Sequence, residues 1–237
     1  MDNRKSHQRD TGPMKLSFII PTLDEAKTLE KTLRPLAETS HEVIVVDGGS
    51  ADGTRDVASA RTHRVISSPP GRGRQQDVGA RAAGGNVLFF LHADTLLPPG
   101  FDGMILGALE DPGVITGAFR LRIHPATAWL RLVAHMANLR SRFLKLPYGD
   151  QGLFLRRTDY FRAGGFPPWP IMEDVALVGR LNRLGRFRLL DGVVRTSARR
   201  WEKEGPLRAT LRDWSLILRY RLGDSPRALA RHYRHVR

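Results

Sequence analysis

Short, largely apolar runs alternate with helix-like segments through the first 91 residues of this chain. Runs of this kind, bounded by polar or turn-forming residues, are typical of strands buried on both faces. After the first run, Ala26, Leu29, Leu33 and Leu36 recur at helical spacing. The alternation predicts an α/β fold with a Rossmann-like, mostly parallel central sheet and helices on both faces. The four expected strands are LSFIIP (16–21), the run from Val43 to Val46, HRVISSP (63–69) and the run from Val87 to Leu91.

The pattern changes near residue 113, where longer strands and helices replace the regular alternation. GVITGAFRLRI (113–123) is typical of a strand that crosses the sheet or lies at its edge. The remaining segments predict, in chain order, an amphipathic helix (126–146), a strand and short helix (149–166), a helix capped by Gly185 (173–185), a late strand or strand pair (186–197) and a basic helix from Pro206.

The helix expected at 126–146 has a polar stripe opposite an apolar one. Such stripes usually mark a helix that faces the core on one side and water on the other. A surface helix lying on anionic lipid has the same pattern, so both interpretations stay open. The polar stripe is Arg131, His135, Asn138, Arg142 and Lys145, and the apolar stripe is Trp129, Val133, Met136 and Phe143.

Length and patterning favour one main domain with short flanking segments. We expect a disordered tail at 1–13, a domain at 14–205 with two halves (14–112 and 113–205), and a basic helical segment at 206–237. No apolar run reaches the roughly 18 residues of a membrane span, and the start has no signal-like apolar segment. The chain also has no cysteine. We therefore expect a cytoplasmic protein.

The net charge of +14 is concentrated in two segments. Residues 195–237 carry twelve Lys or Arg against four Asp or Glu, and residues 120–157 carry eight against one. Charge this localised indicates an anionic partner, namely a phosphorylated substrate, the inner face of a membrane or nucleic acid. A solvated basic face explains it equally well. We expect a peripheral contact with anionic membrane, and we disfavour nucleic acid because it leaves the acidic residues described next without a role.

Acidic and polar side chains follow three of the apolar runs. Thr22, Asp24 and Glu25 follow the first, Asp47 the second and Asp94 the fourth. Parallel strands deliver their carboxyl ends to a common edge, where open α/β sheets bind ligands. An acidic edge suits sugar hydroxyls, N–H donors of a base, and a divalent cation that joins carboxylate to diphosphate.

A glycine- and arginine-rich loop, PPGRGRQQ (69–76), supplies the complementary charge. Arg72 and Arg74 can clamp phosphate oxygens, while the glycines let the backbone approach closely. Each element alone is also typical of an ordinary surface turn. Together, the acidic edge and the loop predict binding of a nucleoside diphosphate.

In their order, these motifs resemble family 2 glycosyltransferases, which have the GT-A fold. The resemblance spans residues 15 to about 205, and is strongest to a short bacterial subgroup, the radical-SAM/selenodomain-associated or arsenosugar-type transferases. The motifs that carry it are LSFIIPTLDEAKTL, EVIVVDGGSADGT, GRGRQQDVGARAAGGNVLFFLHADTLLPP, GDQGLFLRR, MEDVALVGRL and SARRW.

The resemblance implies a donor site at the strand ends. Asp24 or Glu25 would accept hydrogen bonds from ribose or base, although many relatives have asparagine where this chain has Asp24. Asp47 would accept from a uracil-like N–H, and Asp94 would bind the divalent metal, Mg²⁺ or Mn²⁺. His92 stands where relatives have the first aspartate of an Asp-X-Asp motif. The residues expected to bind nucleotide sugar are Pro21, Thr22, Asp24, Glu25, Asp47, Gly48, Arg72, Arg74, His92 and Ala93.

The resemblance also implies an acceptor site in the second half. Asp174 would be the base, and its neighbour Glu173 would orient an acceptor hydroxyl or cap the backbone. On a helix these two side chains diverge by about 100°, so they cannot both face one substrate. Ser197 replaces the glutamine of processive relatives, which indicates a single transfer. The residues expected near the acceptor and diphosphate are Asp150, Gln151, Arg199, Arg200 and Trp201.

These observations predict an inverting, metal-assisted transferase that moves a sugar from a nucleotide diphosphate sugar, UDP-sugar first, to a hydroxyl acceptor. A sugar-nucleotide nucleotidyltransferase shares the acidic edge, but normally has a glycine-rich loop directly after the first strand, which IIPTLDEAKTL lacks. A basic membrane- or nucleic-acid-binding module accounts for the charge, but gives the strand-end acids no purpose.

Overall fold

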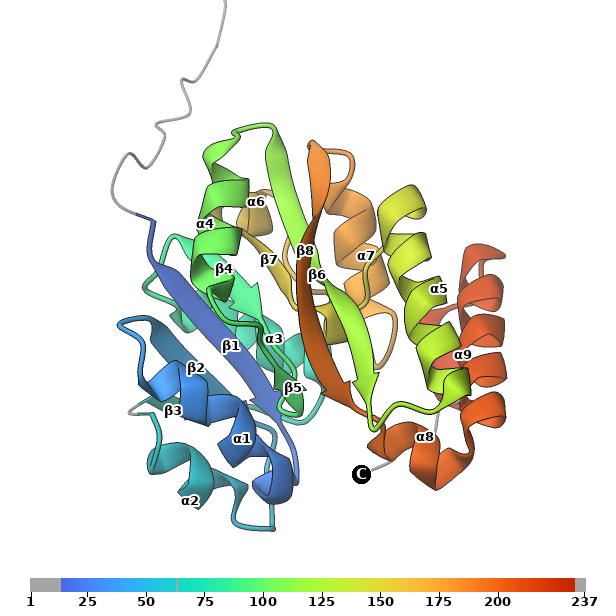
Figure 1. Cartoon of the computed structure of the whole chain (residues 1–237), viewed down its shortest axis with the longest axis horizontal. Coiled ribbons are helices and arrows are strands. Elements are labelled where there is room, and N and C mark those ends of the chain that lie inside the picture. The colour runs from blue at the N-terminus through green and yellow to red at the C-terminus, as the bar shows by residue number, and fades with distance from the viewer. Residues whose placement is uncertain (1–13, 63, 233–237) are drawn as a thin grey trace, which may run out of the picture.

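The computed structural model describes residues 14–62 and 64–232, which form a single curved sheet with helices on both faces (Figure 1). The predicted α/β architecture is confirmed. The tail expected at 1–13 lies outside the described residues. The strands are β1 (Leu16–Thr22), β2 (Glu42–Asp47), β3 (Arg64–Ser67), β4 (Val87–Phe90), β5 (Thr95–Leu96), β6 (Val114–His124), β7 (Leu153–Arg156) and β8 (Arg186–Ser197).

The helices cover the two faces of this sheet unequally. Their bounds are α1 (Ala26–Ala37), α2 (Thr54–Ser59), α3 (Arg72–Ala82), α4 (Phe101–Glu110), α5 (Ala128–Leu144), α6 (Arg157–Arg162), α7 (Glu173–Leu181), α8 (Arg199–Glu204), α9 (Pro206–Arg221) and α10 (Pro226–Ala230), with a 3₁₀ turn, η1, at Gly149–Gln151.

The strand order is β3-β2-β1-β4-β7-β6-β8-β5. The first four strands in this order are parallel, as predicted, and β6 and β8 are parallel too. In contrast, β7 is antiparallel to both β4 and β6, and β5 is antiparallel to β8. The sheet is therefore mixed, and the second half of the chain contributes its antiparallel part.

Alternation along the strands divides the core into two layers. In β1, Phe18 and Ile20 face the layer beneath α1, α2, α4 and α5, whereas Ile19 faces the layer that α3, α6 and α7 cover. Every one of these side chains is fully buried. On the second face α3 lies very close to the sheet, since a Cβ at Gly79 would come within 2.4 Å of Ile19 Cγ2.

The helix expected at 126–146 is present as α5, but it buries a different face from the predicted one. Its buried residues are Leu130, Ala134, Ala137 and Ser141. Met136 and Phe143, predicted for the core, are 44% and 71% exposed. Asn138, predicted for the wet face, instead bonds the backbone of Leu121 in β6. Smaller side chains face the sheet because they allow the helix to approach it closely.

The basic segment after residue 205 forms α9 and α10. Figure 1 shows α9 running alongside α5 at the edge of the molecule. Trp129 Nε1 of α5 donates to Thr210 Oγ1 of α9 over 3.4 Å. Among the described residues, no helix combines the length and apolar character needed to cross a bilayer.

Candidate active site

A cavity of about 630 Å³ lies beyond the carboxyl ends of β1 and β4. The end of β8, the loop before α7, and helices α8 and α9 complete its wall. Thirteen of the eighteen site residues expected from the sequence line it: Pro21, Thr22, Glu25, Arg72, Arg74, His92, Ala93, Asp94, Asp150, Asp174, Arg199, Arg200 and Trp201. The other five, which are not lining residues, are Asp24, Asp47, Gly48, Gln151 and Glu173.

Asp24 and Asp47 organise the turn that follows β2. The carboxylate of Asp47 accepts from the backbone N–H groups of Gly49 and Ser50 and from Ser50 Oγ, at 3.1, 3.1 and 2.5 Å. Asp24 donates its N–H to Ser50 Oγ and accepts from Ala51 N with Oδ1, each at 2.9 Å. Asp24 has a positive φ of 55°, a conformation that aspartate tolerates better than most residues. A contact between either residue and a nucleotide base stays a prediction.

Gln75 is a cavity residue that the sequence reasoning missed. It is 3% exposed, and its Nε2 donates to the carbonyl oxygens of Thr22 and Val46 at 2.7 and 2.8 Å. It thus joins the carboxyl ends of β1 and β2. The sequence signal was the pair Gln75 and Gln76 at the end of the glycine- and arginine-rich loop. In a helix that starts at Arg72, these two residues belong to the buried face.

The sequence predicted that Arg72 and Arg74 would lie in a loop, but they lie in the first turn of α3. Gly71 precedes the helix with a φ of 134°, a backbone conformation that side chains disfavour and that turns the chain into α3. Both arginines line the cavity. The Nε of Arg72 donates to Glu173 Oε1 at the start of α7. The first helical turn therefore brings two guanidinium groups to the cavity.

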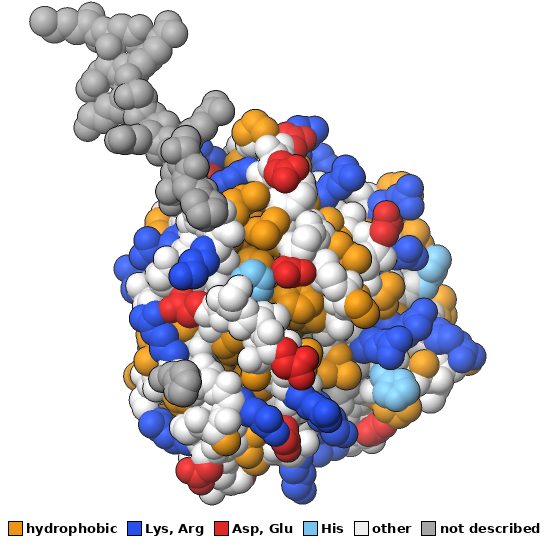
Figure 2. Space-filling model, turned by 60° about the vertical axis from the view of Figure 1, so that its left-hand side comes forward, with side chains coloured by type: hydrophobic (Ala, Val, Ile, Leu, Met, Phe, Trp, Pro, Cys, Tyr) orange, Lys and Arg blue, Asp and Glu red, His pale blue; other side chains and the backbone are white. Residues whose placement is uncertain are grey.

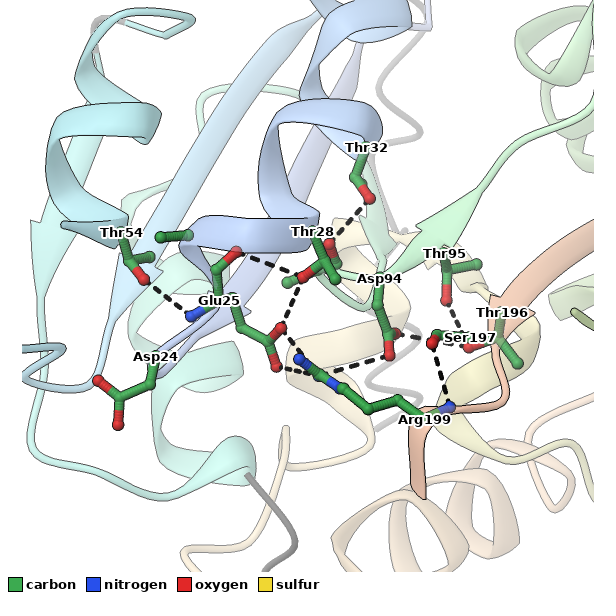
Figure 3. Close-up of polar contacts among 12 residues, drawn as sticks. Asp24, Glu25, Thr28, Thr32, Thr54, Asp94, Thr95, Thr196, Ser197 and Arg199 are labelled. Carbon is green, nitrogen blue, oxygen red and sulfur yellow. Dashed lines mark hydrogen bonds and ion pairs between the residues drawn. The ribbon is translucent and has the colours of Figure 1, made fainter. Parts of the chain in front are cut away.

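The guanidinium of Arg199 lies between the carboxylates of Glu25 and Asp94, as Figure 3 shows. Arg199 donates to both carboxylate oxygens of Glu25, at 2.7 and 2.9 Å, and its NH2 lies 3.7 Å from Asp94 Oδ2. Burial raises the pKa of Asp94 to about 6, and the nearby Glu25 adds to the rise, while Arg199 opposes it. One guanidinium thus serves two carboxylates, and negative charge at Asp94 is left poorly compensated.

The donor set at Asp94 fits a divalent cation that is shared with a phosphorylated ligand. Burial of an undercompensated carboxylate is relieved by an added cation. Mg²⁺ commonly binds through one or two carboxylates plus substrate phosphates. Among the described residues, no group of three or more His, Asp or Glu side chains is placed to hold a metal by itself. A diphosphate and water would have to complete the coordination shell.

His92 is partly buried beside η1, and its buried Nε2 has no hydrogen-bond partner among the described residues. Burial, together with the positive charge of Arg72, lowers its pKa to about 3, so the imidazole is neutral near pH 7. The lack of a side chain at Gly149 permits this packing, because a Cβ there would lie 2.8 Å from His92 Nε2. A neutral, unpartnered ring nitrogen can bind a hydroxyl or a metal.

Glu173 and Asp174 begin α7 and point to different partners, as the helical repeat predicts. Asp174 lines the cavity, and its Oδ2 accepts from Gly149 N at 2.9 Å. Glu173 is 1% exposed and pairs with Arg72, so it neither caps the helix nor lines the cavity. Burial raises the pKa of Glu173, while Arg72 opposes the rise. Met172, with a φ of 64°, sets the direction of this helix start.

The predicted pair Asp150 and Gln151 divides between cavity and core. Asp150 lines the cavity, its Oδ1 has no partner among the described residues, and burial raises its pKa. Gln151 is fully buried, donates to Phe119 O and accepts from Ser141 Oγ, which joins η1 to β6 and α5. Next to them Tyr148, which the sequence reasoning missed, presents a buried hydroxyl group without a partner.

The far end of the cavity is apolar, and among its apolar residues only Trp201 was predicted. Trp201 of α8 is 6% exposed, and Arg200 stacks over its ring at 4.6 Å while bonding Asp213 of α9 at 2.6 Å. The sequence signal was FPPWPIM (166–172), a run of prolines and large apolar residues between two helices. The other apolar lining residues are Pro168, Trp169, Pro170, Ile171, Met172, Leu216 and Ile217.

The sequence profile described as "Glycosyl transferase family 2" matches residues 17–165, more than half of the chain. The chain belongs to glycosyltransferase family 2. This match covers β1 to α6, and thus half of the residues that line the cavity, but not the helix start that carries Asp174.

Individual glycosyltransferases agree with this assignment. Validoxylamine A glucosyltransferase of Streptomyces hygroscopicus subsp. jinggangensis is 34% identical over 109 residues, which are 41% of this chain and 26% of that protein. The chain therefore matches only about a quarter of that relative's length.

Solved structures of glycosyltransferases share the fold. Glucosyl-3-phosphoglycerate synthase from Mycobacterium tuberculosis, in complex with Mg²⁺ and UDP, has a TM-score of 0.56 and 25% identity over 78% of this chain and 70% of that one. Mannosyltransferase PcManGT from Pyrobaculum calidifontis, in complex with GDP-Man and Mn²⁺, has a TM-score of 0.60 and 21% identity, covering 78% and 57%. The predicted GT-A fold is thereby confirmed.

Proposed function

We propose that this family 2 glycosyltransferase moves one sugar from a nucleotide diphosphate sugar to a hydroxyl acceptor, with inversion at the anomeric carbon. The observation that carries the proposal is that Asp94, Asp174 and the arginines 72, 74 and 199 line one cavity. A site of this reaction needs a base for the acceptor and positive charge for the departing diphosphate. This cavity offers both.

Asp174 is the proposed base. The hydrogen bond from Gly149 N fixes its Oδ2, and the start of α7 limits how far its side chain can move. It would remove the proton of the acceptor hydroxyl while that oxygen attacks the anomeric carbon. The new carbon–oxygen bond forms as the bond to the nucleoside diphosphate breaks on the opposite face, and the proton remains on Asp174.

Arg72 and Arg74 would hold the diphosphate through charge-assisted hydrogen bonds. Arg199 would hold Glu25 and Asp94 in place, as it does without ligand. Asp94, with His92 beside it, would hold a divalent cation, which when bound neutralises negative charge on the diphosphate. Glu173 would position Arg72, because its Oε1 accepts from the guanidinium Nε.

Three buried polar groups are proposed to hold the acceptor. His92 Nε2, Tyr148 Oη and Asp150 Oδ1 lack partners among the described residues, and a ligand with several hydroxyl groups would satisfy them. Ser197 lines the cavity where processive relatives have glutamine, which supports a single transfer.

UDP is the proposed nucleotide, because the sequence motifs resemble UDP-sugar enzymes and the mycobacterial neighbour was solved with UDP. GDP-Man in the Pyrobaculum neighbour makes the guanine nucleotide the first competitor to test. The arsenosugar-type subgroup and a cytoplasmic location stay predictions.

Titration calorimetry with UDP, GDP and their sugars, each with Mn²⁺ and with chelator, tests the donor part of the proposal. We expect one nucleotide to bind, more tightly with Mn²⁺. We also expect the corresponding nucleotide sugar to be hydrolysed slowly by water to nucleoside diphosphate and free sugar. Binding of a nucleotide sugar to a variant with Asp174→Asn, without release of diphosphate, would support the base assignment. Absence of binding by every nucleotide and sugar would overturn the proposal.

A further inference from the structure

Two helices, α5 and α9, carry most of the large hydrophobic side chains that are exposed among the described residues. Of the twelve large hydrophobic side chains that are exposed among the described residues, nine belong to α5 or to α9 and its cap. A concentration of this kind marks an interaction surface rather than scattered exposure. The nine are Leu132, Met136, Phe143, Leu144, Leu207, Leu211, Trp214, Leu218 and Leu222.

On each helix these residues form a stripe that is separate from the buried face. In α9 they recur at steps of three and four from Leu207 to Leu222, and in α5 Leu132, Met136 and Phe143 follow one another at steps of four and seven. At about 100° per residue, the buried Ala209 and Leu216 of α9 lie on the side of the helix opposite the stripe, and the buried Thr210 lies at the border of the stripe. The stripes are therefore not the edge of the core.

The two stripes adjoin each other. The contact between Trp129 and Thr210 joins the helices, which run side by side in Figure 1. On the helical repeat, Trp129 lies about one turn from Leu132 on α5, and Thr210 lies about one turn from Trp214 on α9. The exposed stripes thus flank one seam, and together they form what we term the α5–α9 surface.

Basic residues border the α5–α9 surface. Residues 112–149 contain no Asp or Glu, and within α9 the single acid, Asp213, is paired with Arg200 at the cavity. The exposed basic residues beside the stripes are Arg131, Arg142, Lys145, Arg208 and Arg221, and none of them forms an ion pair with a carboxylate of the described chain. By contrast, acidic and basic side chains are interspersed on the face shown in Figure 2.

We propose that the α5–α9 surface binds the interface of an anionic lipid bilayer. Helices that lie in a membrane interface combine Trp, Leu and Phe on one face with flanking Lys and Arg. Each such cation near an anionic surface contributes about 1 kcal/mol. A second copy of this chain is a poorer occupant, because a symmetric contact would bring the same unpaired arginines together.

The inner face of α9 links this surface to the cavity. Leu216 and Ile217 line the apolar end of the cavity, while Trp214 and Leu218 lie on the outer stripe. Bilayer binding would therefore place the apolar end of the cavity close to lipid. The proposal concerns binding alone, and its test does not depend on the proposed glycosyl transfer.

Co-sedimentation of the full chain with vesicles tests it, using phosphatidylcholine alone and phosphatidylcholine mixed with phosphatidylglycerol. We expect binding to the mixed vesicles at low salt that weakens as salt is raised, because salt screens the charges. The double variant R131E/R142E should lower the partition coefficient by at least about tenfold. The double variant W214S/L218S should reduce it comparably by removing apolar contacts.

Two matched controls replace exposed residues of the same kinds elsewhere. Arg34→Glu on α1 and Met104→Ser on α4 should bind as the parent does, and circular dichroism should show all variants folded. Three outcomes would overturn the proposal. The first is no binding to the mixed vesicles at low salt, and the second is an equal loss of binding in the control variants. The third is a dimer in light scattering that W214S/L218S abolishes, because the surface would then be a protein interface.

Discussion

The two sides of the cavity differ in how their polar groups are satisfied. On the β1 side, Glu25 pairs with Arg199, and Gln75 bonds the carbonyl groups at the ends of β1 and β2. On the η1 side, His92, Tyr148 and Asp150 each present a buried polar atom without a partner among the described residues. The named groups of the first side are hydrogen-bonded without a ligand, whereas those of the second side each keep a buried polar atom that a ligand could bind.

The hydrogen-bonded groups of the β1 side hold the geometry of the site, and the unpartnered groups of the η1 side can bind a ligand. A fully satisfied buried network stabilises the fold and holds its geometry. An unsatisfied buried group costs free energy that a ligand can recover on binding. Substitutions on the β1 side should therefore act chiefly on stability, and substitutions on the η1 side chiefly on ligand binding and turnover.

The largest expected effect is on turnover at Asp174, which adjoins the η1 side. Asp174→Asn, nearly isosteric, should lower transfer by at least about 10²-fold while leaving donor affinity almost unchanged, as expected for loss of a general base. Steady-state kinetics and calorimetry measure the two quantities. Near-normal turnover in this variant, with loss in Glu173→Gln, would reverse the two roles.

Ionisation of the partly buried Asp94 should lower the free energy of unfolding. Its pKa of about 6 lies above the ordinary 3.8, so the folded state binds the proton more tightly than the unfolded chain. The resulting stability is fully present below about pH 4 and is lost as pH rises through about 6. A shift of this size corresponds to about 3 kcal/mol.

Asp94→Asn, which cannot ionise, should recover at most that amount at pH 7.5 and flatten the pH dependence of unfolding. It should also remove the Mn²⁺ dependence of nucleotide binding. Urea unfolding at several pH values checks the first effect, and calorimetry with chelator checks the second. A variant less stable than the parent at pH 7.5 would mean that the attraction of Arg199 outweighs burial.

Gln75→Ala tests the β1 side. The change leaves the buried carbonyl groups of Thr22 and Val46 with fewer donors, so the free energy of unfolding should fall by about 2 kcal/mol. Thermal and urea unfolding measure it. If stability were unchanged while nucleotide affinity collapsed, Gln75 would be a ligand-binding residue and the two sides would not differ as described.

Tyr148→Phe tests the η1 side and should have the smallest effect on stability. It removes a buried hydroxyl that has no partner, so the free energy of unfolding should stay within about 0.5 kcal/mol of the parent or rise slightly. The Michaelis constant for the acceptor should increase. A loss of stability as large as that of Gln75→Ala would show that this hydroxyl is satisfied in solution.

Local patterns were enough to predict the strands of the first half of the chain. The alternation of apolar runs and helices indicated the parallel strands β1 to β4, and the polar residues after them lie where strand ends meet. Thr22, Glu25 and Asp94 line the cavity for that reason. The spacing of apolar residues and the direction of each strand are properties of short segments, so they can be predicted from the sequence alone.

The second half of the chain depends on contacts between distant segments. Arg199 meets Glu25 across 174 positions of the chain, and Arg72 meets Glu173 across 101. No local pattern indicates such pairs. The antiparallel insertion of β7 between β4 and β6 likewise depends on which edges are free when the sheet assembles.

Helix α5 shows where the boundary lies. The sequence by itself determined that 126–146 would be a helix with apolar and basic stripes, because a 3.6-residue repeat is written into the order of residues. Only the tertiary structure decided that the stripe of Leu130, Ala134, Ala137 and Ser141 would face β6 while Met136 and Phe143 stayed exposed. Close packing against a sheet favours small side chains, and which face meets the sheet is set by the neighbours that the helix finds.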